Sequence, residues 1–304
     1  MKVTKTAAFL LAAAIVLSGC EQKKAEKLRL QDISCIGGNK YSCTFDGVKH
    51  DFIADMPDNT ENAPLVIMLH GYGDSAEGFR NSIRFEEKAN PLGYAVVYVT
   101  GAPSPRDKTS ANGWNSAAVP FDNKDTEFLV SLAEYLQNEY SLDKNRIYAA
   151  GFSNGACMMH TLAEKADGTF SALACVAGYM QKSIWDKQKG SDISFFQLTG
   201  ENDDFVPKEW DGTAATNPAP SIEKVMEHRI SSINADLSEY REVGNGSVLN
   251  KYENSETHRQ VWELTVKGGG HSWYSEKYNG FDTNELILDF FEAQTMKGIQ
   301  YVRT

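Results

Sequence analysis

Short, continuous apolar segments alternate along the chain with segments of helical periodicity. Apolar runs without polar alternation are typical of strands buried on both faces, and they occur at 64–70 and 95–100. Four more strands are predicted at 147–150, 172–177, 193–198 and 261–266. A strand pair over 41–53, turning at Asp46-Gly47, precedes most of them. Helical spacing predicts helices at 126–140, 154–165, 221–234 and 284–296. This order predicts an α/β fold, with a mostly parallel central sheet and helices on both faces.

The start of the chain has the pattern of an export signal. Lys2 and Lys5 precede an apolar run at 7–17, which is too short to span a bilayer. The run ends in Leu-Ser-Gly-Cys20, which resembles a bacterial lipobox and implies removal of residues 1–19 and lipidation of Cys20. The predicted location is therefore a bacterial membrane face, outside the cytoplasm. A plain secretory signal with an incidental cysteine is the alternative.

A tether and one large domain are predicted after this signal. Residues 20–28 are charged and poor in apolar side chains, and residues 29–304 have ample length for a hydrophobic core. The formal net charge of −11 argues against nucleic acid as a partner. No pattern for a metal site, a phosphate-binding loop or a dinucleotide is present, so we expect no metal and no cofactor. The oligomeric state stays open.

Two cysteines near the start of the domain flank a turn. Cys35 and Cys43 stand on either side of Gly-Gly-Asn39, and export makes a disulfide between them possible. We predict that bridge. Cys157 and Cys175 are expected instead to be small buried side chains.

A serine between two glycines follows one of the predicted strands. Gly151-Phe-Ser-Asn-Gly155 matches G-x-S-x-G, with a strand before it and a helical segment after it. A tight turn from strand to helix requires small residues on both sides of the serine. It also exposes the hydroxyl of Ser153 at a helix N-terminus, where negative charge is favoured. Ser153 is therefore a candidate nucleophile, and a glycine turn with a capping serine is the alternative.

A second glycine motif follows the strand at 64–70. His70-Gly-Tyr-Gly73 is placed where an acyl-transfer enzyme needs backbone N–H groups for the developing oxyanion. The candidate oxyanion donors are the N–H groups of Tyr72 and Asn154. His70 itself is expected to brace the loop.

A serine nucleophile needs a base and an acid that orients the base. His271 stands in a glycine-rich turn just after the last predicted strand, where three glycines allow a sharp change of direction. Asp203 and Asp204 follow the strand at 193–198, and Glu201 is a weaker candidate. Serine, acid and histidine in this order along the chain are typical of α/β-hydrolases.

Together these motifs resemble the polyhydroxybutyrate depolymerase and feruloyl or acetylxylan esterase family of α/β-hydrolases. The matching segments, which span nearly all of the chain after the signal, are His70-Gly-Tyr-Gly, Gly-Trp114-Asn, Asp143-Lys-Asn-Arg-Ile-Tyr, Gly151-Phe-Ser-Asn-Gly, Ala177-Gly, Thr199-Gly, Asp203 with Val-Pro207, and Gly269-Gly-His-Ser-Trp273. The resemblance implies a single catalytic domain over 29–304 with a triad of Ser153, Asp203 and His271. It selects Asp203 over Asp204, because the family's acid lies four residues before its Val-Pro proline.

The chain also departs from the family pattern. Ala156 stands where a second glycine is usual, and Thr199 stands where a histidine is usual. Residues 243–257 resemble an inserted hairpin or loop before the last strand. Insertions of this kind shape substrate sites.

Two tryptophans are candidate substrate contacts. Trp114 and Trp273 lie on loops at the expected active end of the sheet, where they could stack on a phenolic or sugar ring. For Trp114 the alternative is packing beneath the loop at 101–121.

The function expected from the resemblance is that of a lipid-anchored serine esterase. Feruloyl or acetyl esters of plant-wall polysaccharide are the first expectation for its substrates, and short polyhydroxyalkanoate esters are the alternative. A non-catalytic, lipid-anchored binding protein is the alternative of another class. The presence of a complete candidate triad argues against it.

Overall fold

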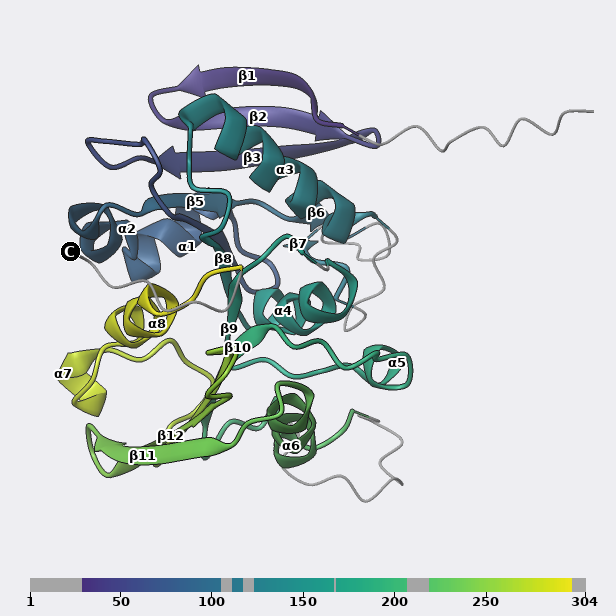
Figure 1. Cartoon of the computed structure of the whole chain (residues 1–304). Coiled ribbons are helices and arrows are strands. Elements are labelled where there is room, and N and C mark those ends of the chain that lie inside the picture. Colours follow the sequence, from purple (N-terminus) through teal and green to yellow (C-terminus); the bar gives the residue numbers. More distant parts are fainter. Residues whose placement is uncertain (1–28, 105–110, 117–122, 167, 207–218, 297–304) are drawn as a thin grey trace, which may run out of the picture.

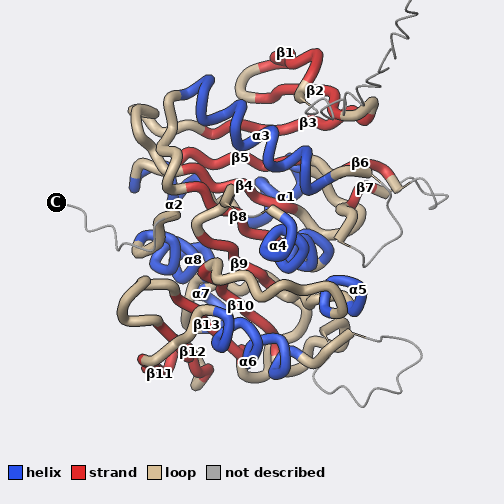
Figure 2. Tube along the Cα trace, turned by 45° about the vertical axis from the view of Figure 1, so that its right-hand side comes forward, coloured by secondary structure: helices blue, strands red, loops and turns tan. Residues whose placement is uncertain are grey.

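The computed structural model describes residues 29–104, 111–116, 123–166, 168–206 and 219–296. Within them, eleven strands form one sheet in the order β1-β2-β3-β5-β4-β8-β9-β10-β13-β12-β11. Figure 2 shows these strands stacked from β1 at one end of the molecule to β11 at the other. A separate two-stranded pair joins β6 (Ala102–Pro103) to β7 (Asn112–Gly113).

The middle of the sheet is parallel and its two ends are antiparallel. The parallel strands are β5 (Ala95–Val99), β4 (Leu65–Leu69), β8 (Ile147–Phe152), β9 (Ala172–Val176), β10 (Ser194–Gly200) and β13 (Gln260–Val266). Beside β5 lie β3 (Val48–Asp55), β2 (Lys40–Phe45) and β1 (Gln31–Gly37). Beside β13 lie β12 (Ser247–Glu253) and β11 (Leu237–Val243). The predicted α/β arrangement is confirmed.

Helices cover both faces of the sheet (Figure 1). One face carries α3 (Asp125–Tyr140), α4 (Asn154–Lys165), α6 (Ile222–Ser232) and the short α5 (Lys182–Trp185). The other carries α1 (Ala76–Ile83), α2 (Glu86–Ala89), the 3-10 helix η1 (Asn90–Leu92), α8 (Thr283–Glu292) and the short α7 (Glu276–Asn279).

The strand β4 shows why the sheet needs both helix layers. Leu65, Ile67 and Leu69 belong to the core that includes side chains of α3 and α4. Val66 and Met68 belong to the core that includes side chains of α1, α2 and α8. Successive side chains of a strand point to opposite faces, so an apolar residue at every position requires cover on both sides. Burying each of these side chains contributes about 1.5–3 kcal/mol.

The end of the last helix and the start of the expected insertion differ from the prediction. The last helix ends at Glu292 instead of residue 296, because the chain turns away to place Gln294 in the interior. There Ser194 Oγ donates to Gln294 Oε1 at 2.6 Å. The insertion expected at 243–257 is a hairpin of β11 and β12, and it begins earlier, at Leu237.

The predicted disulfide between Cys35 and Cys43 is wrong. Both thiols are free, with Cys35 exposed and Cys43 buried. The hairpin register explains this, because Cys35 lies opposite Tyr41, two residues away from Cys43 along β2. A disulfide requires Cα atoms within about 7 Å, which favours residues directly opposite each other.

Several predictions fall outside the described residues. These are the signal at 1–19, the tether at 20–28 and the lipidation of Cys20. Within the ranges that the structure describes, no helix has the length and apolar character needed to cross a membrane.

Candidate active site

Four polar loops meet at the carboxyl ends of the parallel strands. Ser153 directly follows β8, and the glycine loop that begins at His70 follows β4. Asp203 follows β10, and His271 follows β13. Parallel strands bring their carboxyl ends to one edge of the sheet, which is where ligands bind in open α/β folds.

The turn at Ser153 is strained and depends on its flanking glycines. Ser153 has φ 55° and ψ −114°, with α4 beginning at the next residue. A Cβ on Gly151 would lie 2.3 Å from the carbonyl oxygen of Gly155. A Cβ on Gly155 would in turn lie 2.3 Å from the carbonyl oxygen of Leu69. Only glycine fits these positions, which explains the motif and projects the serine from the strand end.

His271 lies between Ser153 and Asp203. Its Nε2 is 2.9 Å from Ser153 Oγ, and its Nδ1 is 2.9 and 3.1 Å from the two carboxylate oxygens of Asp203. A proton on Nδ1 satisfies this geometry, because Nδ1–H then donates to Asp203 and Nε2 accepts from the serine hydroxyl. The three side chains can therefore pass a proton from the serine to the histidine.

The structure distinguishes the two adjacent aspartates. Asp203 is buried, and its Oδ1 also accepts a hydrogen bond from Phe205 N at 2.9 Å. Asp204 is exposed on the same turn. Asp203 is thus the carboxylate that lies against the histidine, as the resemblance implied. Glu201 instead accepts from Gly268 N at 2.7 Å and holds the start of the glycine-rich turn.

His70 braces the loop after β4, as expected. Its ring is fully buried, Gly101 N donates to Nε2 at 2.9 Å, and Nδ1 lies 2.6 Å from Gly71 O. Burial lowers the pKa of His70 below its usual value, which favours the neutral ring that these two bonds require. Gly71 is thereby held against the turn, where an added Cβ would lie 3.4 Å from Ser153 Cβ.

The predicted contact of Trp114 with substrate is wrong. Trp114 has no exposed surface, and its indole Nε1 donates to His70 O at 3.0 Å. The ring is a support beneath the glycine loop, which matches the alternative of packing in the interior. Trp114 is buried because it belongs to the hydrophobic core, in the same cluster as Leu69 and Phe128.

The two candidate oxyanion donors come from the serine turn and from the glycine loop. Asn154 begins α4, and Tyr72 lies in the glycine loop one residue after Gly71. The Asn154 side chain is buried and is occupied by Trp114 and Ser116, so only the backbone of this residue is suited to face a substrate oxygen.

A family model described as Esterase PHB depolymerase matches residues 54–194, a range that includes both glycine motifs. Over this range the chain is similar to that esterase family. It is 26% identical over 235 residues to the putative esterase NocK of Nocardia uniformis subsp. tsuyamanensis, covering 70% of this chain and 66% of NocK. It is also 26% identical over 205 residues to feruloyl esterase B of Thermothelomyces thermophilus, covering 64% of this chain and 66% of that protein.

A third relative is the bifunctional acetylxylan esterase/xylanase XynS20E of Neocallimastix patriciarum, 26% identical over 162 residues. That alignment covers 53% of this chain and 22% of XynS20E. The chain therefore spans at most 66% of these three curated relatives. Among solved structures, the acetyl xylan esterase from Aspergillus awamori is similar with a TM-score of 0.56 and 12% identity, covering 80% of this chain and 93% of that one. This likeness confirms the α/β-hydrolase fold.

The surroundings of Ser153 and His271 are aromatic. The ring of Phe205 lies 4.8 Å from that of His271 and is 69% exposed. The ring of Phe152 lies 5.1 Å from His271, and Trp273 packs edge-on against Phe152 at 6.4 Å. Trp273 is half-buried, and its Nε1 donates to Asn284 at 2.8 Å. Trp273 therefore borders this aromatic cluster, and its predicted contact with substrate stays a prediction.

Sequence reasoning missed Phe205, Phe152 and Tyr274. Phe152 is the variable residue inside the serine motif, and Phe205 is an aromatic residue in an otherwise polar turn, which was the available signal. The Tyr274 hydroxyl donates to Gly270 O and braces the turn that carries His271. Burial, with the nearby charge of Asp203, raises the pKa of Tyr274 to about 12, so the hydroxyl keeps its proton for this bond.

Proposed function

We propose that this chain is a serine esterase that hydrolyses carboxylic esters through an acyl-enzyme on Ser153. The observation that carries the proposal is the contact of His271 with both partners, at 2.9 Å from Ser153 Oγ and 2.9 Å from Asp203 Oδ2. Both distances lie within the range for direct proton transfer and orientation.

The reaction proceeds in two halves. His271 Nε2 takes the hydroxyl proton while Ser153 Oγ attacks the ester carbonyl, and Asp203 stabilises the resulting imidazolium. The backbone N–H groups of Tyr72 and Asn154 hold the oxyanion. The imidazolium then gives its proton to the leaving alcohol. Water attacks the acyl-enzyme with His271 again as base, and the carboxylic acid and free serine are released.

The preferred substrates in this proposal are esters of aromatic acids such as ferulic acid. Phe205, Phe152 and Trp273 offer rings beside the reacting groups, and Phe205 is largely exposed. An aromatic acyl group gains about 0.5–1.5 kcal/mol from packing against such a ring, beyond its buried area. The relatives that include a feruloyl esterase and an acetylxylan esterase support a plant-wall ester, and the family description supports a hydroxyalkanoate ester as runner-up.

A comparison of three substrates tests this order. Methyl ferulate, acetylated xylan and hydroxybutyrate oligomers are assayed side by side, and kcat/KM is expected to be highest for methyl ferulate. Phe205→Ala should raise KM for methyl ferulate several-fold and leave KM for a small acetyl ester nearly unchanged. Tyr278→Ala is the matched control, since Tyr278 is 71% exposed and belongs to α7. Equal losses on both esters would assign Phe205 to positioning His271 instead.

The proposal includes a lipid anchor at Cys20. Its support is the sequence pattern at 1–20 alone. Cys20→Ser is expected to release the protein from the membrane fraction or to leave it unprocessed. A processed Cys20→Ser protein that still sediments with membranes would rule the anchor out.

The alternative of another class is a non-catalytic binding protein. A chain that binds esters without hydrolysing p-nitrophenyl acetate would support that alternative.

A further inference from the structure

The strand β11 leaves a long, regular edge at one end of the sheet. From Leu237 to Glu242 every residue is exposed, including Leu237 at 54% and Tyr240 at 77%. β11 pairs with β12 over seven consecutive residues without a bulge. The opposite edge, β1, has register shifts between Gln31 and Ser34 and between Cys35 and Gly37. Bulges of that kind protect an edge from pairing, so β11 is the edge that is open to another strand.

The sequence of β11 is complementary to itself in the antiparallel direction. It reads Leu-Ser-Glu-Tyr-Arg-Glu-Val, with Tyr240 at its centre. When two copies cross at Tyr240, Glu239 of each faces Arg241 of the other, and Leu237 of each faces Val243 of the other. Opposite charges and apolar pairs directly across a ladder both stabilise strand pairing.

We propose that two copies of this chain associate through antiparallel pairing of β11 with β11, around a two-fold axis at Tyr240. The partner is a second copy because the strand's charges complement each other only in this arrangement. A register moved by two residues in one direction places Glu239 opposite Glu239, and in the other direction it places Arg241 opposite Arg241. Both are like-charge pairs, which are destabilising. A one-residue shift is incompatible with the two-fold axis, since it would set side chains of opposite faces against each other.

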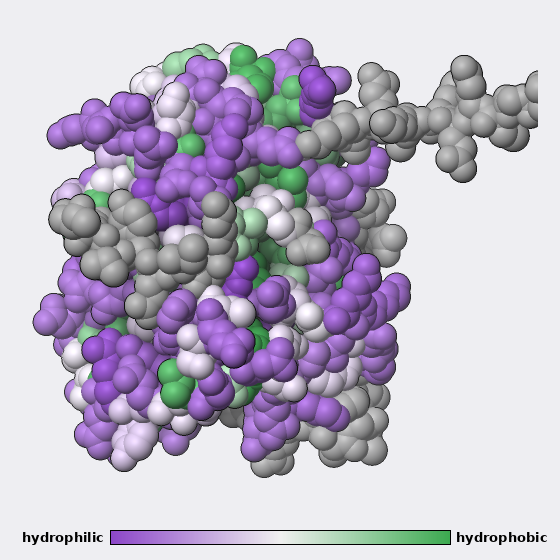
Figure 3. All heavy atoms as spheres, in the orientation of Figure 1, coloured by the Kyte–Doolittle hydropathy of each residue, from purple (hydrophilic) through white to green (hydrophobic). Residues whose placement is uncertain are grey.

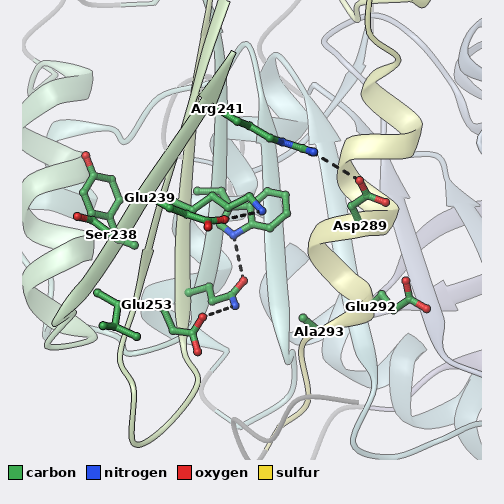
Figure 4. A pocket seen from close by; sticks show the side chains of 12 residues that line it. Ser238, Glu239, Arg241, Glu253, Asp289, Glu292 and Ala293 are labelled. Atoms are coloured by element: carbon green, nitrogen blue, oxygen red, sulfur yellow. Dashed lines mark hydrogen bonds and ion pairs between the residues drawn. The ribbon is translucent and has the colours of Figure 1, made fainter. Parts of the chain in front are cut away.

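The two charged residues remain available for this contact. Within one copy Glu239 lies 3.1 Å from Lys251 Nζ, and Arg241 lies 3.8 Å from Asp289. Their side chains are still 71% and 49% exposed. Figure 4 shows Glu239 and Arg241 on the side of β11 that faces α8, with Ser238 on the other side. Each cross-copy pair would therefore extend an existing pair into an alternating network of charges.

The hydrophilic character of the surface is compatible with association through the backbone edge of β11. The face seen in Figure 3 is mostly hydrophilic, with small separate hydrophobic areas. An edge strand supplies affinity mainly through backbone hydrogen bonds and needs no broad apolar face. An interface of one strand per copy is small, so the dimer should be weak and should form at micromolar concentrations.

Sedimentation equilibrium of the full chain in mild detergent, from about 1 to 100 μM, tests the proposal. The wild-type chain should show a monomer–dimer equilibrium. Tyr240→Asp sets two carboxylates opposite each other at the axis and should weaken association about tenfold or more. Ile36→Asp, on the exposed surface of β1, is the matched control and should associate like the wild type.

A charge exchange makes the test specific to the register. Glu239→Arg alone and Arg241→Glu alone each create two like-charge pairs across the axis and should weaken the dimer. The double variant Glu239→Arg/Arg241→Glu restores opposite charges and should recover association relative to either single variant. A wild-type chain that stays monomeric over the whole range would overturn the proposal. So would a dimer that Ile36→Asp abolishes while Tyr240→Asp leaves it intact.

Discussion

The side-chain amide of Asn154 forms hydrogen bonds with both the N–H and the carbonyl group of Trp114. Its Oδ1 accepts from Trp114 N at 2.7 Å, and its Nδ2 donates to Trp114 O at 3.2 Å and to Ser116 Oγ at 3.0 Å. Trp114 in turn donates from its indole to His70 O. The residue after the reacting serine therefore ties the serine turn to the support of the glycine loop.

We expect Asn154→Ala to destabilise the protein by about 1–3 kcal/mol, because the buried N–H of Trp114 loses its acceptor. Denaturant unfolding measures this loss. Asn154→Asp keeps the acceptor but loses the donor, so its effect should be different in size and its esterase activity should also fall. Unchanged stability in Asn154→Ala would show that water replaces the amide without cost.

The triad is expected to act as a unit. Ser153→Ala and His271→Ala should each lower kcat sharply, and the double variant should lose hardly more than either single variant, because nucleophile and base are useless apart. A residual rate of order 10³-fold over water should survive from the oxyanion donors and binding. The check is steady-state kinetics on p-nitrophenyl acetate with protein free of contaminating esterase. Additive losses in the double variant would argue against a shared step.

The adjacent aspartates provide a matched pair. Asp203→Asn should lower kcat severely, because the amide no longer holds the required histidine tautomer. Asp204→Asn should stay within a few-fold of the wild type, since Asp204 is exposed and the contact to His271 belongs to Asp203. A reversed result would assign the acid to Asp204.

Asp125 should make stability depend on pH. Burial raises its pKa from 3.8 to about 7, while Asn115 N donates to it at 2.6 Å. Between these two values the folded state keeps a proton that the unfolded chain has released, so the stability of the wild type falls as pH rises through this window. Asp125→Asn should therefore become more stable relative to the wild type, by a few kcal/mol, between about pH 4 and pH 7.

Unfolding free energies at several pH values measure that difference. Glu127→Gln, at an exposed position in the same helical turn, is the control and should keep the wild-type dependence. A constant difference between Asp125→Asn and the wild type at every pH would contradict the raised pKa.

The free thiols should differ in reactivity. Cys35 is exposed, whereas Cys43 is buried and its pKa is raised to about 12 by burial and by the charge of Asp51. Because the thiolate is the reactive form, a maleimide should label Cys35 quickly and Cys43 only after unfolding. Peptide mapping by mass spectrometry without reduction identifies the labelled residues. Recovery of a peptide in which Cys35 and Cys43 are linked would restore the disulfide.

Much of the fold was predictable because its signals are local. Each parallel strand is a short, mostly apolar segment of five to seven residues, and the polar motifs follow the ends of β4, β8, β10 and β13. Gly151 and Gly155 indicate the serine turn in the sequence, because a Cβ at either position would clash with the backbone. The end of α8 was less predictable, because the interior position of Gln294 depends on Ser194, which is distant along the chain. The start of β11 depends on the pairing of Leu237 with Glu253 across a hairpin.

By itself the sequence determined the α/β order, the turn that carries Ser153 and the strand ends that carry Asp203 and His271, since each depends on neighbours along the chain. Only the tertiary structure decided which residues meet. It buried Trp114 under the glycine loop, set Cys35 opposite Tyr41 instead of Cys43, and brought Phe205 against His271. The physical reason is that side-chain direction alternates from residue to residue, and strand order and register then determine which side chains, distant in sequence, share a face.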